Sequence, residues 1–147
     1  MTEDQFWKII EGAGAESTEI EERRANLVAS LCELSAKEQY EFGKIYFKKR
    51  AAADIEELCS ALTTVELCGD DSWGDFCDHL VSLGKEIYES VVSDPESVVD
   101  NMHAREFGEC YFYNTPKEAF AINQGIDYEA HDYYDLERQF KEAAGKG

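Results

Sequence analysis

The chain has 147 residues, of which 44% are hydrophobic and 12% aromatic. That length fits a single domain, and the apolar content is sufficient for a buried core, which excludes a disordered chain. The net charge of −18 repels phosphate backbones and so disfavours nucleic-acid binding. No run approaches the roughly 18 apolar residues of a membrane helix, and acidic residues near the N-terminus argue against an export signal. We therefore expect a cytoplasmic protein that does not bind membranes.

The first helix signals are polar caps followed by apolar residues at helical spacing. Capping boxes are predicted for the pairs Thr2/Gln5, Thr18/Glu21 and Ser35/Glu38, each just before a helical apolar pattern. Asp54 and Glu57 are a fourth candidate cap. The alanines 51–53 leave open the alternative that the third helix continues straight through this point.

The second half of the chain carries glycine and proline signals. Gly84 is placed to end a helix that buries Trp73 and Phe76. Proline opens a helix after Asp94 and again at Thr115–Pro116, and Gly125 should stop the latter helix. The only strand-like stretch is residues 110–113, which is too short to distinguish from a helical segment. These patterns predict an all-α fold, a single compact domain of seven or eight short helices.

The five cysteines occur singly, with no CxxC pair. An odd number of isolated cysteines argues against a disulfide framework. Cys59 falls in an apolar helical pattern with Leu58 and Leu62, where a free cysteine acts as a small hydrophobic residue.

Three stretches resemble a known bacterial family, domain of unknown function 4240: DQFWKII near the N-terminus, LVASLCELSAKEQYEFGKIYF, and CGDDSWGDFCDHLVSLGKEIYESVVSDPESV. The third is the most specific, with a glycine, a double acid and an aromatic before two helices. The match covers most of residues 4–100 and continues more loosely to about residue 125. Residues 51–67 depart from the pattern. The resemblance implies a cytoplasmic helical domain and carries no activity. We accordingly divide the chain into a helical domain, 1–125, and an acidic, tyrosine-rich extension with a short helix, 126–147.

The acidic residues Asp70, Asp71, Asp75 and Asp78 form the most distinctive local cluster. Asp71, Asp75 and Asp78 share one helix face, and three carboxylates there could bind magnesium or calcium. The simpler interpretation is that the first two favour the helix N-terminus and the others form a solvated face. A zinc site from Cys68, Cys77 and His79 has no standard ligand spacing, so we expect no metal and no cofactor.

The acidic charge is unevenly distributed along the sequence. Residues 1–50 have a net charge of −2, whereas residues 51–147 have a net charge of −16. Such a field attracts basic proteins and accelerates their association. A role in solubility alone is the alternative. The C-terminal stretch 127–137 alternates acids with tyrosines, a composition that suits a basic, partly apolar partner surface. Its tyrosines could instead pin the last helix to the core.

The sequence therefore predicts a non-enzymatic binding protein, monomeric or weakly self-associating, that occludes the active site of a basic protein. A bacterial immunity protein paired with a toxin is the expected type. The alternative is a metal-dependent enzyme or accessory domain that uses the Asp70–His79 cluster. The expected partner-binding residues lie in two patches: Asp70, Asp71, Asp75, Asp78, Tyr128, Asp132, Tyr133, Tyr134 and Asp135.

Overall fold

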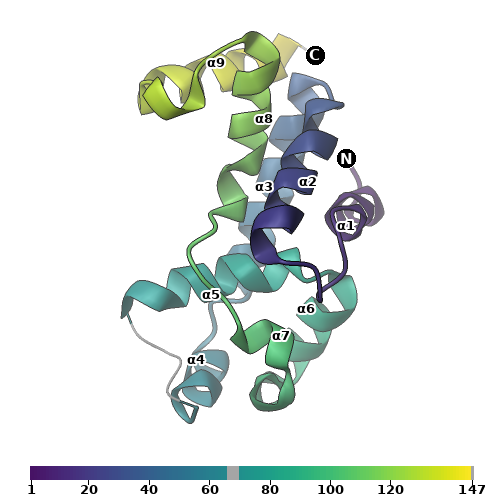
Figure 1. Ribbon diagram of the computed structural model, residues 1–147, viewed down its shortest axis with the longest axis vertical. Helices are drawn as coiled ribbons and strands as arrows, with labels where there is room; N and C mark the ends of the chain where they lie inside the picture. Colours follow the sequence, from purple (N-terminus) through teal and green to yellow (C-terminus); the bar gives the residue numbers. More distant parts are fainter. Residues whose placement is uncertain (66–69, 147) are drawn as a thin grey trace.

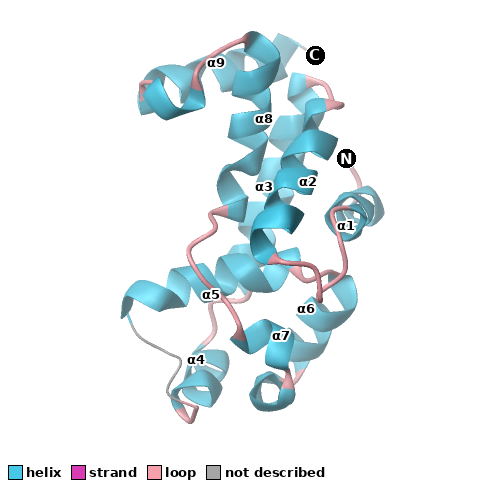
Figure 2. Ribbon diagram, viewed as in Figure 1, coloured by secondary structure: helices cyan, strands magenta, loops and turns pink. Residues whose placement is uncertain are grey.

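The structure is a computed structural model that describes residues 1–65 and 70–146. Every regular element in these residues is helical and none is a strand, which confirms the all-α prediction (Figure 2). Eight of the described α-helices have eight or more residues, in agreement with the expected seven or eight. No helix in the described part of the chain is both long enough and apolar enough to cross a lipid bilayer.

The elements follow one another along the chain with short connections, and three of them are 3₁₀ helices (η). They are α1 (Glu3–Gly12), α2 (Ile20–Cys32), α3 (Ala36–Ala52), α4 (Glu56–Thr63), α5 (Asp70–Ser82), α6 (Lys85–Ser93), η1 (Pro95–Asp100), α7 (Met102–Arg105), η2 (Phe112–Asn114), α8 (Thr115–Gln124), η3 (Tyr128–Ala130) and α9 (Tyr133–Lys146).

The molecule has an upper and a lower level in the view of Figure 1. Helices α2, α3 and α8 stand side by side in the upper level, where α8 packs on both α2 and α3. Helix α9 lies across their top, and α5 crosses beneath them. The lower level holds α4, α6, α7 and η1, with α4 packed on η1. The longest described helix, α3, packs on α9 at the top and on α5 beneath it.

Two of the predicted caps are confirmed in full. The Thr2 hydroxyl accepts a hydrogen bond from the Gln5 amide at 3.2 Å, and the Gln5 side chain accepts one from the Thr2 amide at 2.9 Å. Ser35 and Glu38 form the same reciprocal pair at the start of α3. Gly125 ends α8 in the left-handed conformation, as predicted. In each case the signal is local, so a short sequence window is enough to find it.

Two other predicted caps are wrong. Helix α2 begins after Glu19 with no side-chain cap, because Thr18 lies in the preceding turn, where its carbonyl accepts a hydrogen bond from Arg23 Nε at 3.2 Å. Asp54 does not cap α4; its carboxylate accepts a hydrogen bond from Trp73 Nε1 at 2.8 Å. Helix α3 ends at Ala52 and does not continue. At Asp54 a tertiary partner, 19 residues away in the sequence, has replaced the local one.

Cys59 corrects the expectation of free thiols, because it is disulfide-bonded. The other described cysteines, Cys32, Cys77 and Cys110, are free. Cysteine spacing along the sequence gave no sign of this bond, which depends on where the chain brings Cys59 in space.

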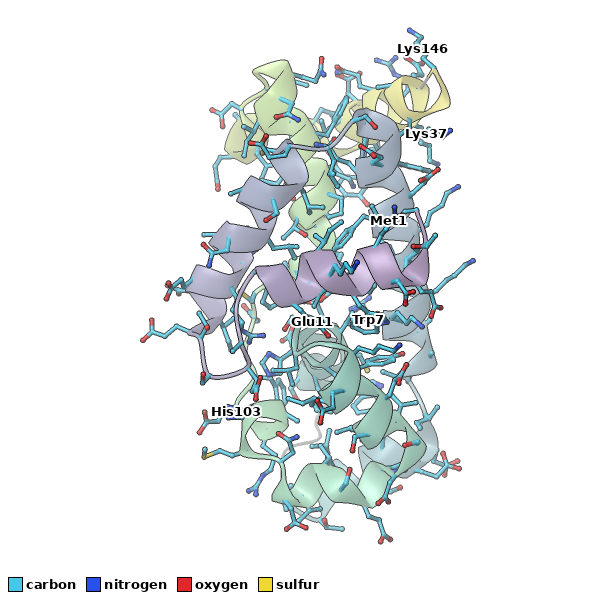
Figure 3. The ribbon with its side chains drawn as sticks, turned by 90° about the vertical axis from the view of Figure 1, so that its right-hand side faces the viewer. Met1, Trp7, Glu11, Lys37, His103 and Lys146 are labelled. Carbon is cyan, nitrogen blue, oxygen red and sulfur yellow. The ribbon has the colours of Figure 1, made fainter. Side chains whose placement is uncertain are left out.

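An aromatic cluster joins the two levels. Phe6 and Trp7 of α1 are buried, and the Phe6 ring lies 4.9 Å from that of Phe42. Trp7 points from α1 toward the lower level, where its ring lies 5.4 Å from that of Tyr88 in α6 (Figure 3). Tyr46 of α3 is fully buried beside Phe6. This packing attaches α1 across α2 and α3, as the same view shows.

Helix α9 is attached to the upper level by a second, smaller core. Leu136 and Phe140 are buried against Phe120 and Ala121 of α8. The Phe140 ring stacks on that of Phe120 at 4.8 Å and meets Tyr40 of α3 edge-on at 5.3 Å. The described part of the extension, residues 126–146, is therefore packed onto the helical domain through α9.

The turn between α5 and α6 depends on a glycine. Gly84 has φ +100° and ψ 167°, a region that is essentially restricted to glycine. Gly84→Ala should lower the free energy of unfolding by about 1–3 kcal/mol, because the added Cβ makes this backbone unfavourable. Chemical denaturation followed by tryptophan fluorescence measures the change.

Gly43→Ala is the matched control. Gly43 lies inside α3, and a Cβ there would stand 3.5 Å from Pro116 Cγ, an ordinary contact distance. The same substitution should therefore be neutral or stabilise the protein by up to about 1 kcal/mol. Equal effects at the two glycines would contradict the assignment of strain to Gly84.

Candidate functional site: an acidic groove

A wide depression in the described surface lies between α4 and η1. It has a volume of about 1080 Å³ and is open to solvent. Five exposed carboxylates line it: Glu56, Glu57, Asp94, Glu96 and Asp100. We call this surface the acidic groove.

The acidic groove has an uncompensated negative charge. The described residues of its lining include no lysine or arginine, and none of the five carboxylates is in an ion pair with a described residue. Ala61, Pro95 and Val99 give the groove an apolar component. Like charges gathered in one depression repel one another, so cations from a partner would relieve the repulsion.

The groove results from the packing of two segments that are about 40 residues apart in the sequence. Leu58 and Leu62 are buried on one face of α4, and Val98 is buried in η1. Burying these faces against each other leaves the first-turn acids of both helices at the surface. Asp94 precedes Pro95, which opens η1 as the sequence predicted. The Asp94 side chain does not cap this helix, so its carboxylate is available to the groove.

Sequence reasoning missed the acidic groove. The available signal was a pair of acids at each of two helix starts, Glu56–Glu57 and Asp94 with Glu96. First-turn acids are commonly explained by the helix dipole, and nothing in the sequence says that these two starts meet.

The predicted acidic patch in α5 is only partly a surface. The side chains of Asp70 and Asp71 lie outside the described residues, and Asp75 is half-buried. Asp78 is 3% exposed, so the expectation that it belongs to a solvated acidic face is wrong. Its carboxylate faces inward.

Asp78 instead holds a buried turn of the backbone. Its two carboxylate oxygens accept hydrogen bonds from the amides of Phe112 at 2.8 Å and Tyr113 at 3.0 Å. Its own carbonyl accepts a hydrogen bond from the Tyr46 hydroxyl at 2.7 Å. Burial raises the pKa of Asp78 to about 6, against the opposing effect of the two amide donors. Residues 110–113, the strand-like stretch of the sequence, therefore lead into the 3₁₀ helix η2. The Asp78 carboxylate binds the first two amides of η2.

The neighbours of Asp78 are also inside the protein. His79 Nε2 lies 2.8 Å from the His103 carbonyl, and burial lowers the pKa of His79 to about 4, so the ring is neutral and Nε2 donates. Cys77 is buried, which raises the pKa of its thiol to about 12. Cys68 lies outside the described residues. No group of three potential metal ligands occurs among the residues that the structure describes.

The residues expected in the C-terminal patch have different environments. Tyr133 and Tyr134 are exposed, Tyr134 to 81%, so neither pins the last helix. Tyr128 is half-buried against the smaller core. Asp132 accepts a hydrogen bond from the Asp135 amide at 2.9 Å and thereby caps α9.

Asp135 is partly neutralised. Its carboxylate forms an ion pair with Arg138 and accepts a hydrogen bond from Gln139 at 2.9 Å. These contacts lower its pKa below the usual value for an aspartate, chiefly through Arg138. The C-terminal patch therefore offers exposed tyrosines more than unpaired carboxylates.

The family described as "Protein of unknown function (DUF4240)" matches residues 1–135. The chain belongs to this family. No curated protein and no solved structure matches the sequence. The match confirms the resemblance seen in the sequence and includes the acidic groove of this DUF4240 protein.

The surfaces of the DUF4240 domain are spatially separate. Helix α9 crosses one end of the molecule and α4 lies at the other, with α5 between them (Figure 1). The acids of the groove and the tyrosines at the start of α9 therefore do not form one continuous patch.

The pH dependence of stability tests the buried Asp78–His79 pair. Asp78, with its pKa raised from 3.8 to about 6, contributes stability at low pH that is lost as the pH rises through that interval. His79, with its pKa lowered from 6.5 to about 4, costs stability as the pH falls through its own interval. The changes of stability with pH that are due to Asp78 and to His79 have opposite signs, and they should largely cancel in the parent protein.

Replacing one of the two residues should reveal the pH dependence of stability that is due to the other. With Asp78→Asn, stability should rise between pH 4 and 6.5; with His79→Gln, it should fall between pH 4 and 6. Each slope should reach about 1.4 kcal/mol per pH unit at most. Urea unfolding across this range measures both, and parallel profiles for the two variants would refute the assignment.

Proposed function

We propose that this protein is a non-enzymatic binding protein that uses the acidic groove to dock on a basic protein and inhibits it by covering its active site. A bacterial immunity protein that neutralises a cognate toxin is the type of protein that best fits this description. The observation that carries the proposal is the groove itself, with five exposed carboxylates and no lysine or arginine among the described residues that line it.

The charge of the groove supports recognition of a basic surface. Over the Debye length of about 8–10 Å at physiological ionic strength, a partner approaching the groove would meet mainly negative charge. Such a field raises the rate of association and rejects acidic partners. The charge thus favours fast and selective docking more than it favours high affinity by itself.

Affinity requires buried apolar contacts in addition to charge. Val99 and Pro95 are half-buried on the groove lining and can be covered further by a partner. The exposed tyrosines of α9 lie at the far end of the molecule and would engage only a partner large enough to span it. The groove is therefore the central contact in this proposal.

The alternative of a metal-dependent enzyme or accessory domain has less support. Asp78 is occupied by two backbone amides, and His79 is buried against the His103 carbonyl. Neither side chain faces solvent where a substrate could reach it.

Complex formation with a basic partner tests the proposal. The full chain is co-expressed with the product of an adjacent gene, and association is measured at low and high salt. We expect an equimolar complex whose association rate falls as salt rises. Glu57→Gln/Asp94→Asn/Glu96→Gln should slow association by about tenfold, because these carboxylates steer the encounter.

A variant with the same loss of charge outside the groove is the control. Glu16, Glu22 and Glu33 are exposed and lie outside the groove, so neutralising all three to glutamine should change the rate little. An equal effect of both triple variants would show that only net charge matters. The absence of any stoichiometric partner would overturn the proposal.

A further inference from the structure

A second cavity lies at the other end of the molecule and has the opposite character. It measures about 350 Å³ and lies between α3 on one side and η2, α8 and α9 on the other. Cavities of roughly 300–1,000 Å³ with mostly apolar walls are typical small-molecule sites. We call it the aromatic pocket.

Aromatic rings make up much of the wall of the aromatic pocket. They are Tyr40, Phe47, Tyr113, Tyr133 and Phe140. Phe47 and Tyr133 remain 51% and 56% exposed, and the Phe47 ring lies 5.8 Å from that of Tyr113. Exposed rings facing one cavity offer flat surfaces for a planar ligand to stack on.

One face of α3 creates the space between these rings. Tyr40, Lys44 and Phe47 recur at helical spacing on that face, with Gly43 among them. Because Gly43 has no side chain, only backbone stands opposite Pro116 of α8. The hollow is thus a property of the α3 sequence combined with the position of α8.

The charges on the lining are mainly positive. Lys44, Lys48 and Lys117 face a single acid, Glu137, for a local net charge of +2 in a chain of −18. Lys117 is nearly buried and is paired with Glu137 at 2.6 Å. Lys44 and Lys48 are exposed, and no described residue forms an ion pair with either.

The local charge decides which ligand the rings can accept. A set of aromatic rings without cations would suit an ammonium group through cation–π contacts. Here cations already lie at three of the rings. Lys117 Nζ is 4.1 Å from the Tyr133 centroid, Lys44 Nζ is 5.0 Å from that of Tyr40, and Arg50 Cζ is 4.8 Å from that of Tyr113. A second cation would be repelled. The acidic groove lies between α4 and η1 in the lower level, at the other end of the molecule from α9.

We propose that the aromatic pocket binds a planar aromatic anion, with its ring against the exposed faces of Phe47 and Tyr133 and its carboxylate toward Lys44 and Lys48. The ligand class is a small aromatic carboxylate. This site is separate from the acidic groove, so the proposal does not depend on the proposed function.

Calorimetric titration of the full chain with indole-3-acetate and with tryptamine tests the proposal. The two probes share the indole ring and differ in the sign of their charge. We expect indole-3-acetate to bind with a dissociation constant of about 1 mM or tighter, and tryptamine to bind at least about tenfold more weakly because the lysines repel it. Equal binding of the two probes, or no binding of indole-3-acetate, would overturn the proposal.

Two double variants separate the pocket from the overall charge. Lys44→Gln/Lys48→Gln should weaken indole-3-acetate binding by about fivefold or more. Lys8→Gln/Lys85→Gln removes the same charge from exposed lysines that do not line the pocket, and should leave affinity within about twofold. Phe47→Ala should also weaken binding, because it removes an exposed ring. Melting temperatures confirm that each variant is folded, and an equal loss in both lysine variants would contradict the assigned site.

Discussion

The buried carboxylate of Asp78 is the interaction on which much of the arrangement depends. It accepts hydrogen bonds from the Phe112 and Tyr113 amides, which fixes the point where the chain leaves the lower level and enters α8. Tyr111, just before these amides, has a left-handed backbone with φ 54°, a conformation uncommon outside glycine. A buried acceptor for two adjacent amides offsets the cost of that turn.

The consequences of this interaction reach the surface of the molecule. Fixing Tyr113 places its ring beside Phe47 at the wall of the aromatic pocket, and η2 leads directly into α8. The Arg23 guanidinium lies over the Phe112 ring and donates to the Ser82 carbonyl at 3.0 Å. Polar groups in the interior thus hold α2, α5 and the start of α8 in register, and apolar packing alone would be less specific about this register.

The surface charge is organised over short distances in spite of the large net charge. The acidic groove gathers unpaired carboxylates at one end, while the aromatic pocket gathers lysines and rings at the other. Since salt screens charges beyond about 8–10 Å, each surface presents its own sign to a partner or ligand. The charge of −18 is therefore a poor description of either surface.

The sequence by itself determined the helical class, the capping boxes at Thr2 and Ser35, the stop at Gly125 and the family, because each depends on residues close together in the chain. It also located the acidic excess in residues 51–147. Only the tertiary structure decided which acids gather on one surface. The spacing of Asp78 predicted a solvated face, but Asp78 is buried. Helical spacing could not show this, because the amides that bind its carboxylate come from residues 34 and 35 positions away in the sequence. Conversely, Glu57 and Asp94 looked like ordinary first-turn acids and form one groove, because α4 and η1 bury their apolar faces against each other.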